Sequence, residues 1–571
     1  MPPALTYLLR YPAVSAFGTR TVVAAVLIGA LHLAALVTML LTEAGLFAQL
    51  AFILVWAVLN GVLLAAFRRP AISAALSLLL VMAIIGLSEF KISIVSMSIN
   101  FFDVLIIDRD TIAFLLAIFP DLRVTVAIAL LVAVPALGLI WWHDPFRVPR
   151  RTPALGAIGG FGAFIGLCVA VPVDPGDVWT GANHVSIFAR SGISTASALM
   201  THGWIDFDRV TTDRLLPATD DTCTPKRKPP HIIMVLDEGS FDITALPGVN
   251  VPDGYARYFR SFDGKSRRLF VEGVGGPTWY TEYNVLTGLS VQSYGSMSYY
   301  VTRIAAGHVK RGLPQSLRRC GYKTISLYPA YGAFLSARAF QTGTGVERFL
   351  DLDNLKQVGN ETDYFFYDQA LRELKHDKSN QPLFIFVYTV INHFPWDWRF
   401  RPDLTPDWRN LNANLEVDEY VRRQTMSADD FAKFMGHLRQ DFPDESFLVV
   451  RFGDHQPFLA KPLLDAAADQ PAAPGRLLPD DLRYYTTYYA MDTVNFRPQN
   501  VSSALDALDA PYLPLVVLEA AGLPLDASFA EQKRILQRCG GLFYRCASGA
   551  EARRFNRLLM DAGLITGMSS R

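Results

Sequence analysis

The chain has 571 residues, which is too long for one domain, and its 53 basic and 53 acidic side chains leave no net charge. This balance gives no electrostatic support to nucleic-acid binding, so no nucleic acid is expected among the partners. Hydrophobic residues make up 51% of the chain, and the excess is concentrated in its first third. This distribution predicts a membrane-embedded part followed by a more polar part.

Five apolar runs in the first third are about long enough to cross a bilayer and contain almost no charge. They are Thr21–Leu41, Leu46–Phe67, Ala71–Leu87, Val124–Trp142 and Leu155–Val173. Residues 1–173 are therefore predicted to form an α-helical transmembrane domain of five spans. The basic residues beside these runs favour a cytoplasmic amino terminus. The chain is then a multi-pass protein of the cytoplasmic (inner) membrane, with everything after residue 173 on the periplasmic or extracellular side.

Two polar segments accompany these spans. Residues 98–123 mix apolar residues with charged ones that include Asp103, Asp108, Arg109 and Asp110. This mixture suits either a helix in the membrane interface that helps to guide a lipid headgroup or a plain connection. Residues 174–230 have the composition of a periplasmic linker, with a short interfacial helix near Ser186–Met200.

Residues 231–571 alternate strand and helix patterns, which predicts an exported α/β domain with a mostly parallel central sheet. The strand candidates are Ile232–Leu236, Arg268–Val271, Thr324–Tyr328, Leu383–Val390, Phe447–Val450 and Tyr485–Met491. The helical candidates are Thr281–Leu289, Gly312–Arg319, Thr362–Lys375 and Ser427–Arg439, with closing helices such as Ala550–Ala562. Export permits disulfides between Cys539 and Cys546 and between Cys223 and Cys320, although sequence alone leaves the connectivity open.

Three distant stretches carry metal-ligating side chains. HIIMVLDEGS ends in Asp237 and Glu238, GGPTWYTEYNVLTGLS contains Thr278, and FLVVRFGDHQP contains Asp454 and His455. Because open α/β sheets collect ligands at the carboxyl ends of their strands, we expect these groups to converge. Carboxylates, one imidazole and a hydroxyl suit manganese or magnesium and tolerate zinc. The cation would favour deprotonation of Thr278, which is otherwise a weak nucleophile.

Several residues can each be interpreted either as part of the functional site or as having only a structural role. Thr278 is either the nucleophile or only a helix N-cap, and Glu282, one turn later, either orients a hydroxyl or substrate amine or is a solvated acid. His393 either protonates a leaving alkoxide or binds phosphate, or it stacks in a tryptophan-rich loop with Trp396, itself a candidate substrate contact. Arg338 is either a phosphate clamp or a surface residue.

These motifs resemble the alkaline phosphatase/sulfatase superfamily and, within it, the membrane-anchored lipoteichoic acid synthase group. The segment GGPTWYTEYNVLTGLS resembles the nucleophile segment of that group, and the NHFP and GDH segments follow in the expected order. The resemblance implies a sulfatase-like fold for residues 231–571. It also implies one catalytic metal, manganese in the synthases and zinc in phosphoethanolamine transferases, bound by Glu238, Thr278, Asp454 and His455. His393 and Arg338 would contact the phosphate or headgroup.

Two departures from the family matter. The family strand often ends in Leu-Glu-Ser, whereas this chain has Leu236-Asp237-Glu238-Gly239, so Asp237 competes as a ligand. Sulfatases need Cys or Ser in a Cys/Ser-x-Pro-x-Arg setting, which the Gly-Pro-Thr-Trp-Tyr segment does not offer, so sulfate hydrolysis is disfavoured.

The resemblance implies a membrane-bound transferase that moves a phospholipid headgroup through a phosphothreonine intermediate. The expected partners are the membrane, a phosphatidylglycerol or phosphatidylethanolamine donor with phosphoglycerol favoured, and a cell-envelope glycan or lipid-linked acceptor. The alternatives are a phosphoethanolamine transferase acting on lipopolysaccharide or lipid A, an exported phosphodiesterase or sulfatase-type hydrolase, and an inactive scaffold.

Overall fold

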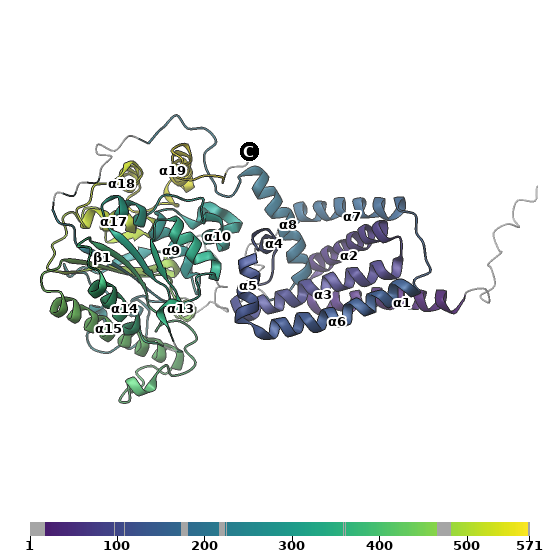
Figure 1. Ribbon diagram of the computed structural model, residues 1–571, viewed down its shortest axis with the longest axis horizontal. Coiled ribbons are helices and arrows are strands. Elements are labelled where there is room, and N and C mark those ends of the chain that lie inside the picture. The colour runs from purple at the N-terminus through teal and green to yellow at the C-terminus, as the bar shows by residue number, and fades with distance from the viewer. Residues whose placement is uncertain are drawn as a thin grey trace, which may run out of the picture. The chain divides into compact units, whose positions relative to one another are not determined.

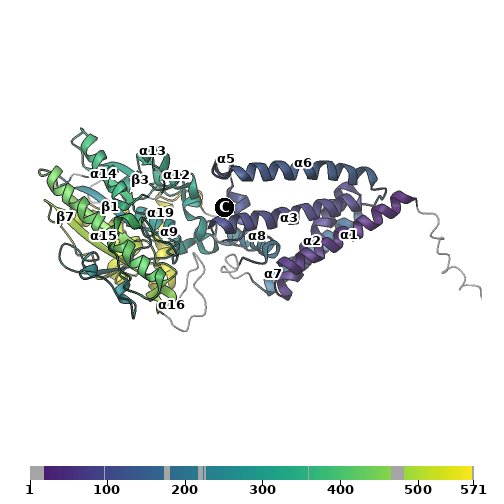
Figure 2. The same cartoon turned by 90° about the horizontal axis from the view of Figure 1, so that it is seen from below.

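The structure is a computed structural model that describes residues 18–568, apart from residues 96, 108, 173–180, 216–222, 224, 226, 358, 360 and 465–480. It divides into two compact units, Met1–Ser197 and Ala198–Arg571 (Figures 1 and 2). Parts of the predicted linker, residues 174–180, 216–222, 224 and 226, lie outside the described residues, as does Asp108.

Among the described residues, five helices of the first unit are long and apolar enough to cross a membrane, with mean hydropathies of 1.8 to 2.5. They are α1 (Thr19–Thr42), α2 (Leu46–Phe67), α3 (Pro70–Val95), α6 (Pro120–His143) and α7 (Arg151–Ala170). The prediction of five apolar helices is confirmed. Buried acidic side chains shape the helix ends, since Asp144 Oδ2 accepts a hydrogen bond of 2.8 Å from Ala71 N in the first turn of α3.

Three shorter helices complete this unit. The segment 98–123 contains α4 (Phe101–Ile106) and α5 (Arg109–Ile118) before the start of α6. Asp103 is fixed in a capping box with Asn100 and pairs with Lys91 at 2.8 Å. The helix predicted near residues 186–200 is present as α8 (His184–Thr201), and the buried Glu43 accepts hydrogen bonds from Val185 N and the Ser186 hydroxyl at its amino end.

The described part of the second unit contains a mostly parallel sheet, as the strand pattern predicts. Its strand order is β4-β3-β5-β1-β6-β7-β2-β8. The strands are β1 (His231–Asp237), β2 (Arg267–Phe270), β3 (Lys323–Leu327), β4 (Arg348–Leu350), β5 (Leu383–Tyr388), β6 (Phe447–Gly453), β7 (Thr486–Val494) and β8 (Ala507–Asp509). Strands β1, β3, β4, β5 and β6 run parallel, while β7 is antiparallel to its neighbours β6 and β2. The unpredicted strands β4 and β8 have three residues each, too few to show a periodicity.

Helices cover both faces of this sheet. The longer ones are α9 (Thr278–Thr287), α14 (Asp363–His376), α15 (Leu415–Asp441), α17 (Leu513–Ala520), α18 (Ala527–Cys539) and α19 (Ala550–Asp561). Short helices are α10 (Val301–Ala305), α11 (Leu313–Arg319), α12 (Ala337–Gly343), α13 (Leu352–Leu355) and α16 (Ala460–Leu464). Figure 1 shows α14 and α15 on one face of the sheet, with α9 and α17 on the other. Strands β1, β5 and β6 are therefore buried on both sides.

Helix α15 begins twelve residues before the predicted Ser427. Its first turns bury charged side chains, including Arg422 and Arg423, which pair with the buried Glu419. These buried charges hide the apolar stripe by which an amphipathic helix is recognised in a sequence.

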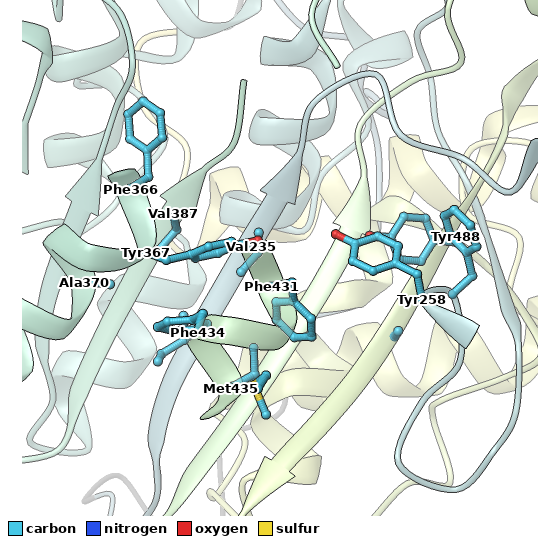
Figure 3. Close-up of a cluster of buried hydrophobic side chains, with 14 of the residues drawn as sticks. Val235, Tyr258, Phe366, Tyr367, Ala370, Val387, Phe431, Phe434, Met435 and Tyr488 are labelled. Atoms are coloured by element: carbon cyan, nitrogen blue, oxygen red, sulfur yellow. The ribbon is translucent and has the colours of Figure 1, made fainter. Parts of the chain in front are cut away.

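The main core lies between the sheet and helices α14 and α15. Figure 3 shows Phe434 and Tyr367 packed together beside Val235 and Val387 of the central strands. The ring centroids of Tyr367 and Phe434 are 4.7 Å apart in a stacked arrangement, and both side chains are completely buried.

Replacing Phe434 with alanine should lower the free energy of unfolding by roughly 3–5 kcal/mol, because it leaves a cavity in this core. The matched control is Phe262→Ala, since Phe262 is 43% exposed and its loss should cost less than about 0.5 kcal/mol. Thermal unfolding of the two variants, followed by near-ultraviolet circular dichroism, checks the difference. Equal melting temperatures would contradict this description of the core.

Both candidate disulfides are formed, Cys223–Cys320 and Cys539–Cys546. The first ties the segment before β1 to the end of α11, and the second closes a short loop after α18. Disulfides of this kind are typical of proteins outside the cytoplasm.

Candidate metal and nucleophile site

The end of strand β1 separates two neighbouring carboxylates. Asp237 accepts hydrogen bonds from the hydroxyls of Tyr258 (2.8 Å), Tyr488 (2.6 Å) and Thr389 (3.0 Å), so its oxygens are engaged on the α15 side of the sheet. Glu238 follows the strand and lies with Asp454 and His455 instead. Of the two acids that the sequence leaves in competition, the structure brings Glu238 to the cluster.

The Gly-Asp-His triplet lies at the carboxyl end of β6. Asp454 Oδ1 accepts hydrogen bonds of 2.8 Å from the backbone N–H groups of Gly239 and His455, which ties the ends of β1 and β6 together. A Cβ atom at Gly453 would lie 1.8 Å from the Ser240 carbonyl oxygen. Only glycine therefore allows the two strand ends to approach closely enough for Asp454 and Glu238 to meet.

The loop before α9 brings Thr278 to the same place. Gly275 has φ +78°, a Cβ atom there would lie 2.2 Å from the Phe458 ring, and its N–H donates to the Gln456 carbonyl at 2.8 Å. Thr278 is the first residue of α9 and makes no capping hydrogen bond, so the N-cap interpretation is wrong. Its hydroxyl donates instead to Glu238 Oε2 at 3.0 Å.

The clustered side chains match the donor set of a divalent cation. Ligand atoms of Glu238, Asp454 and His455 lie within 4.8 Å of one another, and all three residues are buried. His455 Nε2 is 3.3 Å from Asp454 Oδ2 and 3.4 Å from Glu238 Oε1. Asp454 Oδ2 and His455 Nε2 are buried, and within the described part of the chain neither has a hydrogen-bond partner. Such atoms are costly to leave unpaired, and a cation among them would satisfy both.

The cluster holds the carboxylates of Glu238 and Asp454 close together, so that their negative charges repel each other. Burial and the nearby charge of Glu238 raise the pKa of Asp454 above its ordinary value. Burial also opposes ionisation of Glu238, but its contact with His455 and the charge of His393 lower its pKa below the ordinary value. Burial disfavours the charged form of His455, yet the Asp454 and Glu238 carboxylates outweigh it and raise the pKa of His455. A divalent cation would compensate this concentration of negative charge.

His393 lies in the exposed loop after β5. Its Nδ1 atom is 2.7 Å from the Phe394 carbonyl oxygen, and its ring stacks on Phe394 with centroids 4.5 Å apart. Its charge helps to lower the pKa of Glu238, so His393 lies within electrostatic reach of the cluster. With Nδ1–H donated to the carbonyl, Nε2 is the atom available to exchange a proton with a substrate.

The remaining predicted contacts have partners of their own. Arg338 pairs with Asp351 at 2.5 Å and donates to the Phe349 carbonyl at 3.0 Å. Glu282 is fully buried and accepts a hydrogen bond of 2.9 Å from Gln341, so the solvated-acid interpretation is wrong, and burial raises its pKa to about 7. Trp396 is 8% exposed and packs edge-on against Tyr420. The structure does not bring these three side chains into the cluster.

Two threonines that hold the cluster residues in place were not among the predicted site residues. The Thr281 hydroxyl donates to the Asp454 carbonyl at 2.5 Å, and Thr389 accepts from Glu238 N at 3.1 Å while donating to Asp237. Thr281 lies three residues after Thr278, on the same helical face, which is a signal that sequence alone offers. Thr389 merely ends an apolar strand, and nothing in the sequence distinguishes it.

Asp363 anchors the loop that carries His393. This buried carboxylate accepts hydrogen bonds from Val390 N (2.8 Å), Ile391 N (3.0 Å) and the Ser427 hydroxyl. Burial, followed by the Asp237 charge, raises the pKa of Asp363 to about 7. Because the folded-state pKa exceeds the unfolded value, this group makes stability fall as the pH rises from about 4 to about 7.

The variant Asp363→Asn keeps the acceptor for both N–H groups and cannot ionise. We expect it to remove a stability loss of roughly 4 kcal/mol, three pKa units at ~1.4 kcal/mol each, between pH 4 and pH 7. Melting temperatures of both proteins across this range test the expectation. Parallel pH profiles would contradict it.

A mostly parallel sheet with a buried carboxylate–imidazole–hydroxyl cluster at its carboxyl edge defines an α/β domain whose cluster could hold a metal ion. Residues 208–481 match the sequence model of the Sulfatase family, so the chain carries a domain of the sulfatase/alkaline phosphatase superfamily. No curated protein matches the chain by sequence.

Several solved structures are similar to this chain. They include the phosphoglycerol transferase GacH of Streptococcus pyogenes in complex with sn-glycerol-1-phosphate (16% identity, 60% of this chain and 92% of that chain, TM-score 0.47). The lipoteichoic acid synthase LtaP of Listeria monocytogenes shares 18% identity over 51% of this chain and 72% of that chain, with a TM-score of 0.40. The periplasmic domain of EptC from Escherichia coli shares 14% identity over 54% and 86%, with a TM-score of 0.37. Likenesses at this level carry no conclusion about a substrate.

Proposed function

We propose that this protein is a membrane-bound, metal-dependent transferase that moves a phospholipid headgroup through a phosphothreonine at Thr278 onto a cell-envelope glycan or lipid-linked acceptor. The observation that carries the proposal is the hydrogen bond of 3.0 Å from the Thr278 hydroxyl to Glu238, inside a buried cluster with Asp454 and His455. The apolar helices would anchor the domain at the outer surface of the cytoplasmic membrane, where its donor lies.

Glu238, Asp454, His455 and Thr278 would hold one divalent ion, with manganese favoured over zinc or magnesium. When bound, such an ion supplies charge neutralisation for the nucleophile and the phosphoryl oxygens. Thr278 is the first residue of α9, and a phosphate that approaches it would face the backbone N–H groups at the amino end of the helix, which supports its role as the nucleophile.

The reaction divides into two displacements at one phosphorus atom. The Thr278 oxygen attacks the donor phosphorus as its proton leaves along the hydrogen bond toward Glu238, and the bond from phosphorus to diacylglycerol oxygen breaks. His393 donates a proton to that oxygen. An acceptor hydroxyl then attacks the phosphothreonine and gives its proton to His393, the bond from phosphorus to Thr278 breaks, and the Thr278 oxygen takes its proton back from Glu238. Water in place of the acceptor would make the enzyme a phosphodiesterase.

The test is a reconstituted assay of the full chain in vesicles that contain labelled phosphatidylglycerol or, in parallel, labelled phosphatidylethanolamine. A neutral gluco-oligosaccharide serves as the acceptor. We expect diacylglycerol release with label on the oligosaccharide, fastest with phosphatidylglycerol. Faster transfer from phosphatidylethanolamine would favour the phosphoethanolamine alternative, and free headgroup phosphate without labelled sugar would indicate the hydrolase.

A further inference from the structure

The segment just after His393 presents large apolar side chains to solvent. In the described part of the second unit, exposed large aliphatic and aromatic residues are otherwise scattered, at Met200, Val210, Phe262 and Val501. Five fall within residues 394–415: Phe394, Trp398, Leu404, Leu411 and Leu415. A concentration of this kind marks a binding surface more often than a chance exposure.

The two aromatic members follow His393 most closely in the sequence and alternate with a buried tryptophan. Phe394 is 48% exposed and Trp398 is 42% exposed, whereas Trp396 between them is turned inward. Phe394 also stacks on His393, the residue that we propose transfers a proton to and from the substrates. Phe394 and Trp398 are together called the aromatic platform below.

The backbone that carries the platform is rigidly held. Arg423 is almost completely buried and donates to the carbonyls of His393 (2.9 Å), Pro395 (2.9 Å) and Trp398 (3.0 Å). The Glu419 carboxylate fixes its guanidinium at 2.7 Å. One buried side chain thus holds three carbonyl groups of the loop by hydrogen bonds, which preorganises the exposed rings for a ligand.

We propose that the aromatic platform binds a pyranose ring of a neutral acceptor glycan. The C–H groups on one face of a sugar ring carry slight positive charge and fit the electron-rich face of an aromatic ring. Asp397 lies between the two platform residues in the sequence and is exposed, so it can accept hydrogen bonds from sugar hydroxyls. The charges of the segment are balanced, three Asp against three Arg within residues 394–415, so it does not complement an anionic lipid surface. This inference rests on the proposed function for its role in transfer, but not for binding.

Binding is tested directly by calorimetry of the full chain in detergent with laminarihexaose and maltohexaose, in the Thr278→Val background that prevents turnover. We expect Trp398→Ala to raise the dissociation constant about tenfold. Trp398→Phe, which keeps a ring over Arg423, should raise it less. The control is Val501→Ala, because Val501 is 39% exposed, lies outside residues 394–415 and should leave the affinity unchanged when it is truncated. No binding of either oligosaccharide, or equal losses in Trp398→Ala and Val501→Ala, would overturn the proposal.

Steady-state transfer separates the platform from the chemistry. With Thr278 intact, Trp398→Ala should raise the acceptor KM about tenfold and leave the donor KM unchanged. A rise in the donor KM instead would assign the loop to the lipid surface and overturn the inference. If the wild-type protein bound the oligosaccharides through Trp398 but released no diacylglycerol, the platform would stand and the proposed function would fall.

Discussion

Replacing Thr278 with valine should lower headgroup release and transfer by a factor on the order of 10³ or more, since valine keeps the shape of threonine and removes only the attacking oxygen. The folded structure should survive, because valine keeps the shape of threonine, removes the hydrogen bond that the hydroxyl donates to Glu238, and takes no cap away from α9. Diacylglycerol release from labelled phosphatidylglycerol, measured beside a melting temperature, gives both quantities.

Two further variants make this result specific. Thr278→Ser restores a hydroxyl and should recover part of the activity, while Thr342→Ala removes an exposed threonine hydroxyl of α12 and should behave as wild type. Undiminished release by Thr278→Val would exclude Thr278 as the nucleophile. An inactive scaffold would show no release in any of these proteins.

The second large effect is expected from Asp454→Asn. Asparagine keeps the Oδ1 acceptor for Gly239 and His455 and replaces the unpartnered Oδ2 atom with an uncharged amide. Bound manganese or zinc, measured by elemental analysis after dialysis, should fall to near zero, and added metal should no longer raise the melting temperature. Activity should fall by at least about 10²-fold.

The matched control for this substitution is Asp237→Asn. Asp237 is the adjacent acid, but its oxygens bind Tyr258, Tyr488 and Thr389, so this variant should lose stability and still bind one metal ion. Metal loss in Asp237→Asn with retention in Asp454→Asn would mean that the ligand set is misassigned.

Much of the fold can be predicted from the sequence because its signals are local. The apolar spans, the buried strands and the Gly-Asp-His triplet each depend on a few adjacent residues, and parallel strands bring their carboxyl ends to one edge. No local signal of this type decides whether Asp237 or Glu238 joins the cluster. Successive residues of a strand point to opposite faces, so a shift of one residue in the strand end reverses the answer, and only the packing of Tyr258 and Tyr488 settles it.

The positions of long side chains also cannot be predicted from sequence patterns. Trp396 and Trp398 are chemically alike, yet one packs on Tyr420 and the other faces solvent, in a loop whose Pro395 and Trp398 carbonyls are held by Arg423. Arg338 illustrates the same limit, since its partners Asp351 and Phe349 lie on a strand end and loop that sequence spacing does not place. Contacts of this kind follow from tertiary packing.

The central claim is that Thr278 carries the headgroup phosphate during turnover, and peptide mass spectrometry tests it most directly. The full chain with manganese is mixed with excess phosphatidylglycerol, without acceptor, and quenched in acid during the first turnover. We expect a glycerol phosphate adduct on the peptide that contains Thr278, formed at the same rate as a burst of about one diacylglycerol per protein. The same burst with Thr278 unmodified, or an adduct on another residue, would contradict it.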